Sequence, residues 1–276
     1  LKPVLVDIEN LGSTICIKDL KKKLNRKTKV ILPVHLYGSV ANLYEIKKII
    51  IKKNIYLIDD CAQAHGAFDD SNYRIKRKIK IGSATDMSCF SLYPGKNLGA
   101  WGDGGAVTTN NRKLYEKILL LRNWGSVKKY HHEELGFNSR LQPLQGVVLS
   151  EKIKNLGYWN MPRNDIAELY FSELESIDSI NLPMIKQGNY HVWHLFVIRI
   201  ANRNQVLKNL SSHKVEFGIH YPVPIHRQKA YSNHKQFNKN FELADSYAGK
   251  LLSLPIFPKM KKSEVMRVVS TIKKYS

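Results

Sequence analysis

One lysine of the sequence lies in a glycine-rich bend, in the segment CFSLYPGKNLGAWGDGGAV at residues 89–107. Lys96 follows an apolar run and has glycines at positions 95, 99, 102, 104 and 105 around it. Most other lysines lie in polar runs such as KDLKKKLNRKTK, which are typical of a solvated surface. Glycines let a backbone turn tightly, and a lysine amine held in such a turn can form a covalent imine with an aldehyde. Lys96 is therefore a candidate catalytic residue.

A carboxylate and a hydroxyl accompany this lysine at the ends of two apolar runs. Asp60 ends the run IYLIDD, and Ser91 lies near the end of the run that leads to Lys96. Pyridoxal phosphate requires this set of groups: an amine for its aldehyde, a carboxylate against its pyridine nitrogen, and hydrogen-bond donors for its phosphate. The three residues together predict a pyridoxal phosphate site.

Each of these residues also has a simpler interpretation. Asp59 and Asp60 would be a helix N-cap and a solvated carboxylate. Lys96 would be a surface lysine in a turn, and Ser91 a hydroxyl at a strand edge. Other glycine-rich phosphate motifs do not fit, because the sequence has neither GxGxxG after a strand nor GxxxxGK[ST]. The combination, and not any single residue, favours the cofactor site.

The elements that must position these residues alternate along the first half of the chain. Strands are predicted at residues 3–8, 29–38, 55–60, 86–93 and 104–110. Helices are predicted at residues 14–24, 42–54 and 112–125. Buried strands separated by helices favour a mostly parallel sheet covered on both faces. Ligands bind at the carboxyl ends of the strands in such a sheet. That rule selects His35, Asp59, Asp60, Gln63, Ser91 and Lys96.

The second half begins with a helical pattern from about Leu141 to Leu174, predicted to be interrupted near Pro162. The remainder is predicted to form a strand, a helix, a strand and a helix within residues 190–257. We therefore expect an α/β fold with a large domain over residues 1–155 and a smaller C-terminal α+β domain over residues 156–276.

Composition narrows the class of protein. The formal net charge is +21, but the lysines are scattered, and no aromatic RNA-binding signature, basic zipper or Cys/His finger accompanies them. This argues against a nucleic-acid partner. No apolar run approaches the roughly 20 residues of a membrane helix, so no membrane partner is predicted. Three distant cysteines and the lack of a CxxC pair favour a reducing compartment, the cytoplasm, and predict no metal site.

Several long segments resemble one family. VILPVHLYG, LIDDCAQAHGA, GSATDMSCFSLYPGKNLGAWGDGGAVTTN, GFNSRLQPLQ, VWHLFVIR and GIHYPVPIH are similar, in order along essentially all of the chain, to the DegT/DnrJ/StrS family. These are sugar-nucleotide aminotransferases of pyridoxal phosphate fold type I. YPGKNLGAWGDGG and HYPVPIH look most similar to the branch that aminates 3-keto-6-deoxyhexoses carried on dTDP. The fold implied is a mostly parallel mixed sheet in the large domain and a smaller C-terminal domain.

The resemblance implies a role for each matching residue. Lys96 matches the lysine that holds the cofactor's aldehyde and moves a proton to or from the substrate carbon. Asp60 matches the carboxylate that faces the pyridine nitrogen, and Gln63 the amide beside the cofactor's 3-oxygen. Ser91 matches a phosphate-binding hydroxyl. Asn138 matches an asparagine that reaches the phosphate in the partner subunit, which implies a homodimer with shared active sites.

Substrate positions and activity follow from the same resemblance. Residues near the sugar nucleotide would be Tyr93, His220, Tyr221 and His226. His220 also suits a structural role, and His35 and His65 are interpreted first as structural residues. The implied reaction is ping-pong transamination from glutamate to a keto-sugar nucleotide, for amino-sugar and surface polysaccharide biosynthesis. Lysine at position 96 speaks against the family's dehydratase variants, which have histidine there.

The sequence departs from the family at its start. Family members usually have a further stretch of roughly a hundred residues, the size of a domain, before the strand that matches PVLVDIE. That stretch supplies a phosphate-binding turn and an aromatic side chain that stacks on the cofactor. We therefore expect either a fragment or a truncated product with an exposed sheet edge and weak cofactor binding. The alternative function is that of an inactive family member with a structural or regulatory role.

Overall fold

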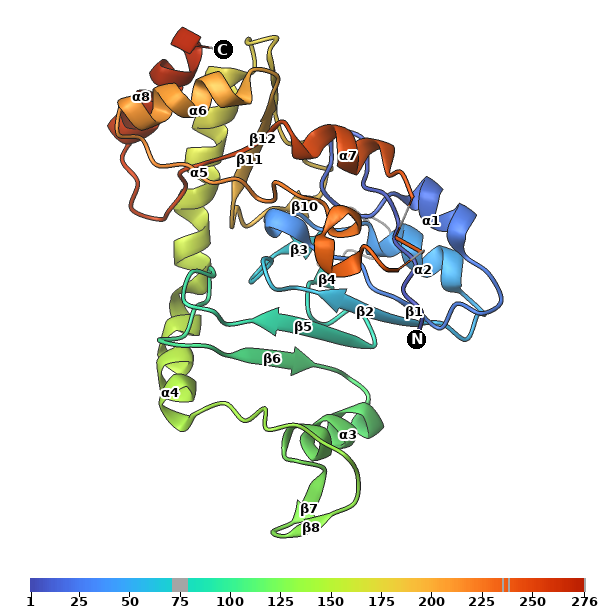
Figure 1. Cartoon of the computed structure of the whole chain (residues 1–276). Helices are drawn as coiled ribbons and strands as arrows, with labels where there is room; N and C mark the ends of the chain where they lie inside the picture. The colour runs from blue at the N-terminus through green and yellow to red at the C-terminus, as the bar shows by residue number, and fades with distance from the viewer. Residues whose placement is uncertain (71–78, 235, 238, 276) are drawn as a thin grey trace.

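The main sheet brings together the strands that carry the predicted site. The computed structural model describes residues 1–70, 79–234, 236–237 and 239–275 (Figure 1). The strands of this sheet are β1 (Val30–Ile31), β2 (Tyr56–Asp60), β5 (Met87–Ser91) and β6 (Gly105–Thr108), in that order. β1, β2 and β5 are parallel, and β6 is antiparallel to β5. The carboxyl ends of β2 and β5 therefore meet at one edge, as the sequence predicts for a mostly parallel mixed sheet.

Two short helices pack with this sheet around one apolar core. They are α1 (Ile17–Lys23) and α2 (Leu43–Ile50), both close to their predicted ranges. Asn42 caps α2 by accepting a hydrogen bond from the Glu45 N–H at 3.0 Å. Leu20, Ile46 and Leu57 are buried in the shared core. The apolar faces of both helices thus hold the start of the sheet in place.

The N-terminal strand prediction is wrong in part. Residues 3–8 form no strand, and the one pairing there is an isolated bridge between Ile8 and Ile15. Leu1 and Val4 are exposed. Alternation of apolar residues gives a strand only where a neighbouring strand takes up the backbone hydrogen bonds, and this segment pairs with no neighbouring strand of the described chain.

The predicted helix break lies earlier than Pro162. α4 (Pro143–Lys152) is followed by the 3-10 turn η2 (Ile153–Asn155), and α5 (Leu156–Leu174) then continues through Pro162. Proline removes one backbone donor, but the buried residues Asn160, Ile166 and Tyr170 hold α5 on both sides of it. α4 and α5 form a column along one side of the molecule (Figure 1).

A second, antiparallel sheet lies at the upper end of this column. Its strands are β9 (Ile180–Asn181), β11 (Phe196–Ile200) and β12 (Leu251–Leu254), in the order β12-β11-β9. All five residues of β11 are buried. Helices α6 (Arg203–Ser212) and α8 (Lys262–Tyr275) pack with α5 around this sheet (Figure 1). The sequence patterns used above did not predict α8.

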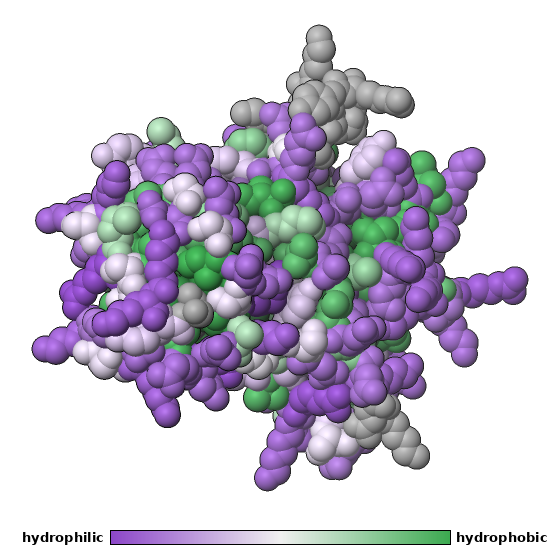
Figure 2. All heavy atoms as spheres, turned by 90° about the horizontal axis from the view of Figure 1, so that it is seen from above, coloured by the Kyte–Doolittle hydropathy of each residue, from purple (hydrophilic) through white to green (hydrophobic). Residues whose placement is uncertain are grey.

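Smaller elements complete the chain. β3 (Phe68–Asp69), β4 (Ile79–Lys80) and β10 (Asn189–Tyr190) form a three-stranded sheet, and β7 (Ser126–Lys128) pairs with β8 (His131–His132). The remaining helices are α3 (Arg112–Arg122) and α7 (Glu242–Ala248), with short turns η1 (Leu36–Gly38), η3 (Ile225–Arg227) and η4 (Lys229–Tyr231). Seen from above, hydrophobic side chains form patches within a mostly hydrophilic surface (Figure 2). Within the described ranges, no helix is long and apolar enough to cross a bilayer.

Candidate active site

The turn that carries Lys96 is held firmly at the end of β5. The Leu92 N–H donates to the Gly104 carbonyl and the Ala100 N–H donates to the Leu92 carbonyl, each at 2.8 Å. Leu92 and Ala100 are buried in a small apolar cluster beside α4. A Cβ atom at Gly99 would lie 2.3 Å from the carbonyl oxygen of Pro94, so glycine is required there. The sequence therefore builds a compact loop of fixed shape around the lysine.

The amine of Lys96 is available for chemistry. Its side chain is partly buried, and across the part of the chain that the structure describes the amine makes no hydrogen bond or ion pair. Burial lowers the pKa of Lys96, and the nearby carboxylate of Asp60 opposes that shift. A lowered pKa increases the fraction of neutral amine, which is the nucleophilic form.

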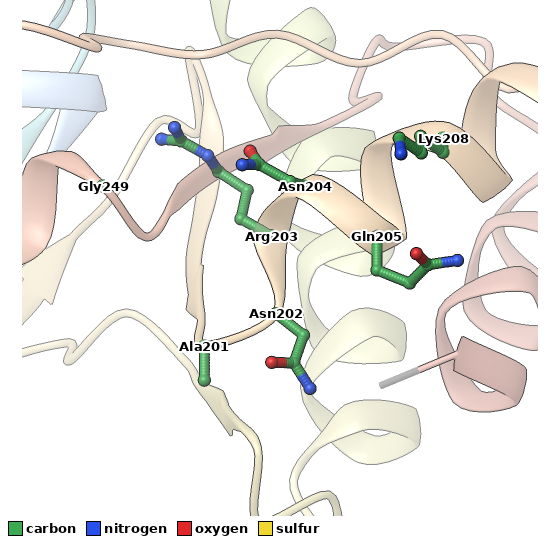
Figure 3. Close-up of a pocket in the computed structure, with 7 residues that line it drawn as sticks. All are labelled: Ala201, Asn202, Arg203, Asn204, Gln205, Lys208 and Gly249. Carbon is green, nitrogen blue, oxygen red and sulfur yellow. The ribbon is translucent and has the colours of Figure 1, made fainter.

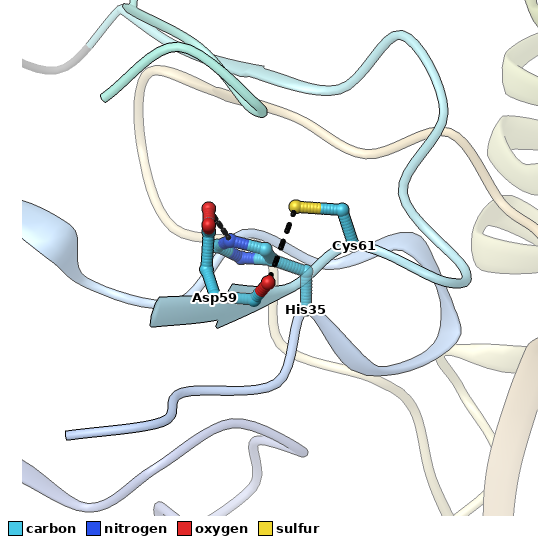
Figure 4. A group of neighbouring side chains, drawn as sticks. All are labelled: His35, Asp59 and Cys61. Carbon is cyan, nitrogen blue, oxygen red and sulfur yellow. Dashed lines mark hydrogen bonds and ion pairs between the residues drawn. The ribbon is translucent and has the colours of Figure 1, made fainter. Parts of the chain in front are cut away.

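Asp59 and His35 form a buried hydrogen-bonded pair at the end of β2. Asp59 is fully buried and accepts a hydrogen bond from Nε2 of His35 at 3.1 Å (Figure 4). It also accepts a hydrogen bond from Oγ1 of Thr85 at 2.6 Å. Nδ1 of His35 accepts from the Ala41 N–H at 3.0 Å, so Nε2 carries the proton. Cys61 brings a third potential metal ligand within 4.8 Å. Because both ring nitrogens of His35 are engaged, we interpret this group as structural.

The side chain of Asp60 lies on the side of β2 opposite to that of Asp59. Its Oδ1 accepts a hydrogen bond from the Ala62 N–H at 2.8 Å, and its carboxylate lies close enough to Lys96 to act on the pKa of that lysine. Asp60 pairs with Cys89 across the sheet, so it lies at the edge where β5 leads into the lysine turn. The structure thus brings Asp60 and Lys96 together, as expected for the two groups that face one cofactor.

Gln63 is oriented by the backbone of Tyr37. Its Oε1 accepts the Tyr37 N–H at 2.6 Å, and its Nε2 donates to the hydroxyl of Tyr221 at 3.2 Å. The hydroxyl of Tyr37 donates to the carbonyl of His220. The amide nitrogen of Gln63 therefore faces the hydroxyl of Tyr221 as a donor, and a donor of this kind suits an anionic cofactor oxygen. Sequence reasoning gave Tyr37 no role, although it lies in the quoted segment VILPVHLYG.

Three histidines lie close enough to Lys96 to feel its charge. Burial lowers the pKa of His65 to about 4 and of His194 to about 3, and the positive charge of Lys96 acts in the same direction on both. The pKa of His220 is also lowered by burial and by Lys96. His194 accompanies Asn97, whose Oδ1 lies 3.1 Å from its Nδ1. Sequence reasoning did not single out either His194 or Asn97, although both lie in motifs that carried the family resemblance.

The other expected residues lie further from this centre or in different surroundings. Ser91 lies at the end of β5, where its Oγ accepts the Tyr93 N–H at 3.4 Å. Asn138 is exposed and forms an isolated bridge with Asn123, outside the group around Lys96. His226 is buried, and its Nε2 lies 2.8 Å from the carboxylate of Asp245.

Two cavities differ in their relation to these residues. The larger, of about 1600 Å³, is lined by residues that include Tyr37, Asp60, Tyr221 and His226. The smaller, of about 430 Å³, lies at the start of α6 and is lined by residues 201–205, Lys208 and Gly249 (Figure 3). None of the predicted site residues lines the smaller cavity. The larger one meets the predicted site at Asp60, Tyr221 and His226, but Lys96, Gln63 and Ser91 do not line it, so it is a candidate for ligand binding next to the lysine turn.

The donor set fits pyridoxal phosphate. Lys96 supplies a free amine with a lowered pKa, and Asp60 a nearby carboxylate. Gln63 supplies an amide N–H donor, and Ser91 a hydroxyl at the end of a strand. These are the groups that the aldehyde, the pyridine nitrogen, the 3-oxygen and the phosphate of the cofactor require.

Comparison with known proteins decides the family. Residues 1–273 match the DegT/DnrJ/EryC1/StrS aminotransferase family. The chain belongs to this family. It is thus an aminotransferase of the pyridoxal phosphate type, and the fold expected from the sequence is confirmed.

Individual relatives share most of the chain. It is 42% identical over 273 residues to the dTDP-3-amino-3,6-dideoxy-alpha-D-galactopyranose transaminase of Aneurinibacillus thermoaerophilus, covering 99% of this chain and 72% of that protein. It is 40% identical over 271 residues to the erythromycin biosynthesis sensory transduction protein EryC1 of Saccharopolyspora erythraea, covering 98% and 72%. The solved structure of DesV from S. venezuelae, in complex with a ketimine intermediate, superposes with a TM-score of 0.91 at 35% identity, covering 98% and 71%.

Proposed function

We propose that this protein transfers the amino group of glutamate to a keto-sugar nucleotide of the dTDP-3-keto-6-deoxyhexose class, in amino-sugar and polysaccharide biosynthesis. The observation that carries the proposal is the free, partly buried amine of Lys96 beside the carboxylate of Asp60. The dTDP-sugar transaminase from Aneurinibacillus thermoaerophilus, 42% identical to this chain, supports the substrate class.

The chain's own residues would divide the work as follows. Bound pyridoxal phosphate supplies an aldehyde that takes up the amino group and a ring that accepts an electron pair. Lys96 would hold the aldehyde and, when released, move a proton at its Nζ. Asp60 would keep the pyridine nitrogen protonated, and Gln63 would donate from Nε2 to the 3-oxygen. Ser91 would donate its hydroxyl to the phosphate.

The substrate side of the proposed site is more open. The side chains of Tyr93 and Tyr221 are 57% and 50% exposed, so both are available to a ligand. His220 and His226 remain proposed substrate contacts, although His226 already pairs with Asp245. The strongly positive chain suits the anionic diphosphate of a nucleotide sugar.

We further propose a homodimer as the active unit. Asn138 is exposed, and apolar side chains near it in sequence, Leu135 and Phe137, are 97% and 67% exposed. Exposed apolar side chains next to a predicted cofactor contact are what a shared site at an interface would require. Three free cysteines, Cys16, Cys61 and Cys89, support a cytoplasmic location.

The proposed domain boundary near residue 155 is supported by the packing. The core of the antiparallel sheet is built from buried residues between Ile166 and Ile272. The core of the main sheet is built from residues between Leu20 and Ala67, with Ile81 and Val192. The turn η2 separates α4 from α5 at this point.

A regulatory role is the second candidate, because the name of one relative, the sensory transduction protein EryC1, refers to such a role. The two candidates differ in a single test. Purified protein loaded with pyridoxal phosphate is given glutamate, and 2-oxoglutarate is measured. With glutamate alone, the proposal predicts that one molecule of 2-oxoglutarate forms per bound cofactor. When a dTDP-linked 3-keto sugar is also added, it predicts continued turnover. Loaded protein that forms no 2-oxoglutarate would favour the regulatory role.

A further inference from the structure

Asn97, the residue after Lys96, ties the lysine turn to two other parts of the chain. Its side chain is buried. Its Nδ2 donates to Oδ1 of Asn160 in α5 at 2.9 Å and to the carbonyl of Val192 at 2.8 Å. Its Oδ1 lies 3.1 Å from Nδ1 of His194. One side chain therefore links the turn, α5 and the segment that precedes β11.

The orientation of the Asn97 amide is fixed by neighbouring groups whose roles as hydrogen-bond donor or acceptor are themselves fixed. The carbonyl of Val192 can only accept, so the nitrogen of Asn97 must face it. Asn160 is fixed in the same way, because its Nδ2 donates to the carbonyl of His65 at 2.9 Å. Both N–H bonds of Asn97 are thus used, and its Oδ1 is left as an acceptor. His194 must therefore carry a proton on Nδ1.

The surroundings of His194 oppose a second proton. Burial is the main cause, and the groups whose positive charge acts on it are Lys96, Arg163, His65 and His220. These groups come from the lysine turn, from α5, from the loop after β2 and from the segment before η3. Together they lower the pKa of His194 to about 3. With Nδ1 protonated and the ring neutral, Nε2 is a lone-pair acceptor.

We propose that Asn97 and His194 are positioning residues for Lys96: Asn97 anchors the lysine turn, and its hydrogen bond holds His194 as a neutral imidazole with its acceptor at Nε2. The inference rests on the proposed role of Lys96. An imidazolium at this place would add a second positive charge near the amine of Lys96 and would lower the pKa of that amine further. A neutral ring adds no charge, so burial and the carboxylate of Asp60 act on the pKa of Lys96.

The tautomer of His194 is a direct readout that needs no cofactor. Histidine is labelled with ¹⁵N, and long-range ¹H–¹⁵N spectra of the apoprotein are recorded, with the His194 signals assigned by their loss in His194→Leu. We expect Nδ1 to be protonated and Nε2 unprotonated, without change between about pH 5 and pH 9. In Asn97→Ala the preference for Nδ1 should weaken. A proton on Nε2, or titration near the ordinary histidine pKa, would overturn the inference.

Cofactor affinity supplies the second readout. His194→Leu removes the hydrogen bond to Asn97 next to Lys96, so we expect the lysine to be less well placed and the Kd for pyridoxal phosphate to rise about tenfold, which corresponds to about 1.4 kcal/mol. His194→Asn keeps an N–H donor near the place of Nδ1 and should restore most of the affinity. His191→Asn is the control, because burial also lowers the pKa of His191, which is more deeply buried than His194, and Lys96 is not among the causes of that shift.

The outcomes separate this inference from the proposed function. Equal loss of affinity in His191→Asn and His194→Leu, or no rescue by His194→Asn, would reduce His194 to a general structural role and overturn the inference. Failure of the wild-type protein to bind the cofactor at Lys96 would instead refute the proposed function, while the tautomer measurement would still decide the geometry around Asn97.

Discussion

Asp59 and Asp60 are neighbours in β2, yet their carboxylates serve opposite sides of the strand. Asp59 is fully buried and bonds His35 and Thr85, whereas Asp60 is half-buried and acts on Lys96. Successive side chains of a strand point to opposite faces, so the pair IDD places one acid in the structural support and the other in the site. The two acids therefore make a matched pair for substitution.

Exchanging each acid for its amide should separate stability from function. Asp59→Asn puts an N–H group against a buried donor and should lower the free energy of unfolding by about 2 kcal/mol. Asp60→Asn should change stability by less than about 0.5 kcal/mol but reduce transamination at least a hundredfold, because the pyridine nitrogen loses its anionic partner. Urea unfolding and 2-oxoglutarate formation measure the two effects. The reverse pattern would show that the two acids have been assigned the wrong way round.

The contribution of Asp59 to stability should depend on pH. Burial by itself raises the pKa of Asp59, but polar contacts with His35, Ser88 and Thr85 outweigh it, so the folded-state pKa lies below 3.8. Such a carboxylate stabilises the fold fully above the unfolded-state pKa and loses that contribution as the pH falls through the folded-state pKa. The gap in unfolding free energy between wild type and Asp59→Asn should be constant above about pH 5 and narrow below about pH 4. A gap that stays constant below that pH would contradict the assignment.

Two glycines of the lysine turn should differ in their tolerance of alanine. At Gly99 a Cβ atom would meet the backbone of Pro94 at 2.3 Å, whereas at Gly95 it would meet only the ring of Tyr93 at 3.5 Å. Gly99→Ala should cost about 1–3 kcal/mol of stability and displace Lys96, with loss of cofactor binding. Gly95→Ala should stay within about 0.5 kcal/mol of wild type. Thermal unfolding and cofactor titration compare the pair, and equal effects would refute the steric account.

The donor role of the Gln63 amide can be tested with a nearly isosteric change. Gln63→Glu keeps the acceptor for the Tyr37 N–H but replaces the donor that faces Tyr221. An anionic cofactor oxygen would then meet a carboxylate, so the Kd for pyridoxal phosphate should rise at least tenfold. Tyr221→Phe is the control, because it frees the Gln63 donor and should leave the cofactor Kd unchanged. Weaker binding in the control alone would assign the contact to Tyr221.

Much of the main sheet was predictable because its signals are local. The apolar runs before Asp60 and Ser91 become β2 and β5, and Asn42 and the apolar spacing in α2 give that helix. Residues 3–8 and the break at η2 were not predictable in this way. A strand depends on a partner elsewhere in the chain, and the stability of α5 through Pro162 depends on tertiary packing.

The candidate site could be predicted from the sequence only for residues whose side chains carry a reactive group. Lys96 and Asp60 carry reactive groups, and the structure brings them together. Asn97 and His194 lie 97 residues apart and show their relation only through the hydrogen bond that folding creates. No local pattern in the sequence reports which ring nitrogen of a histidine is protonated.

The central claim is that Lys96 holds the cofactor. Protein treated with pyridoxal phosphate is reduced with borohydride, digested and analysed by mass spectrometry, with Lys96→Ala and the exposed-lysine control Lys113→Ala treated alike. The account predicts the label on the peptide that contains Lys96 in wild type and in Lys113→Ala, and loss of both label and visible absorbance in Lys96→Ala. A visible band that persists in Lys96→Ala, or a label confined to other lysines, would contradict it.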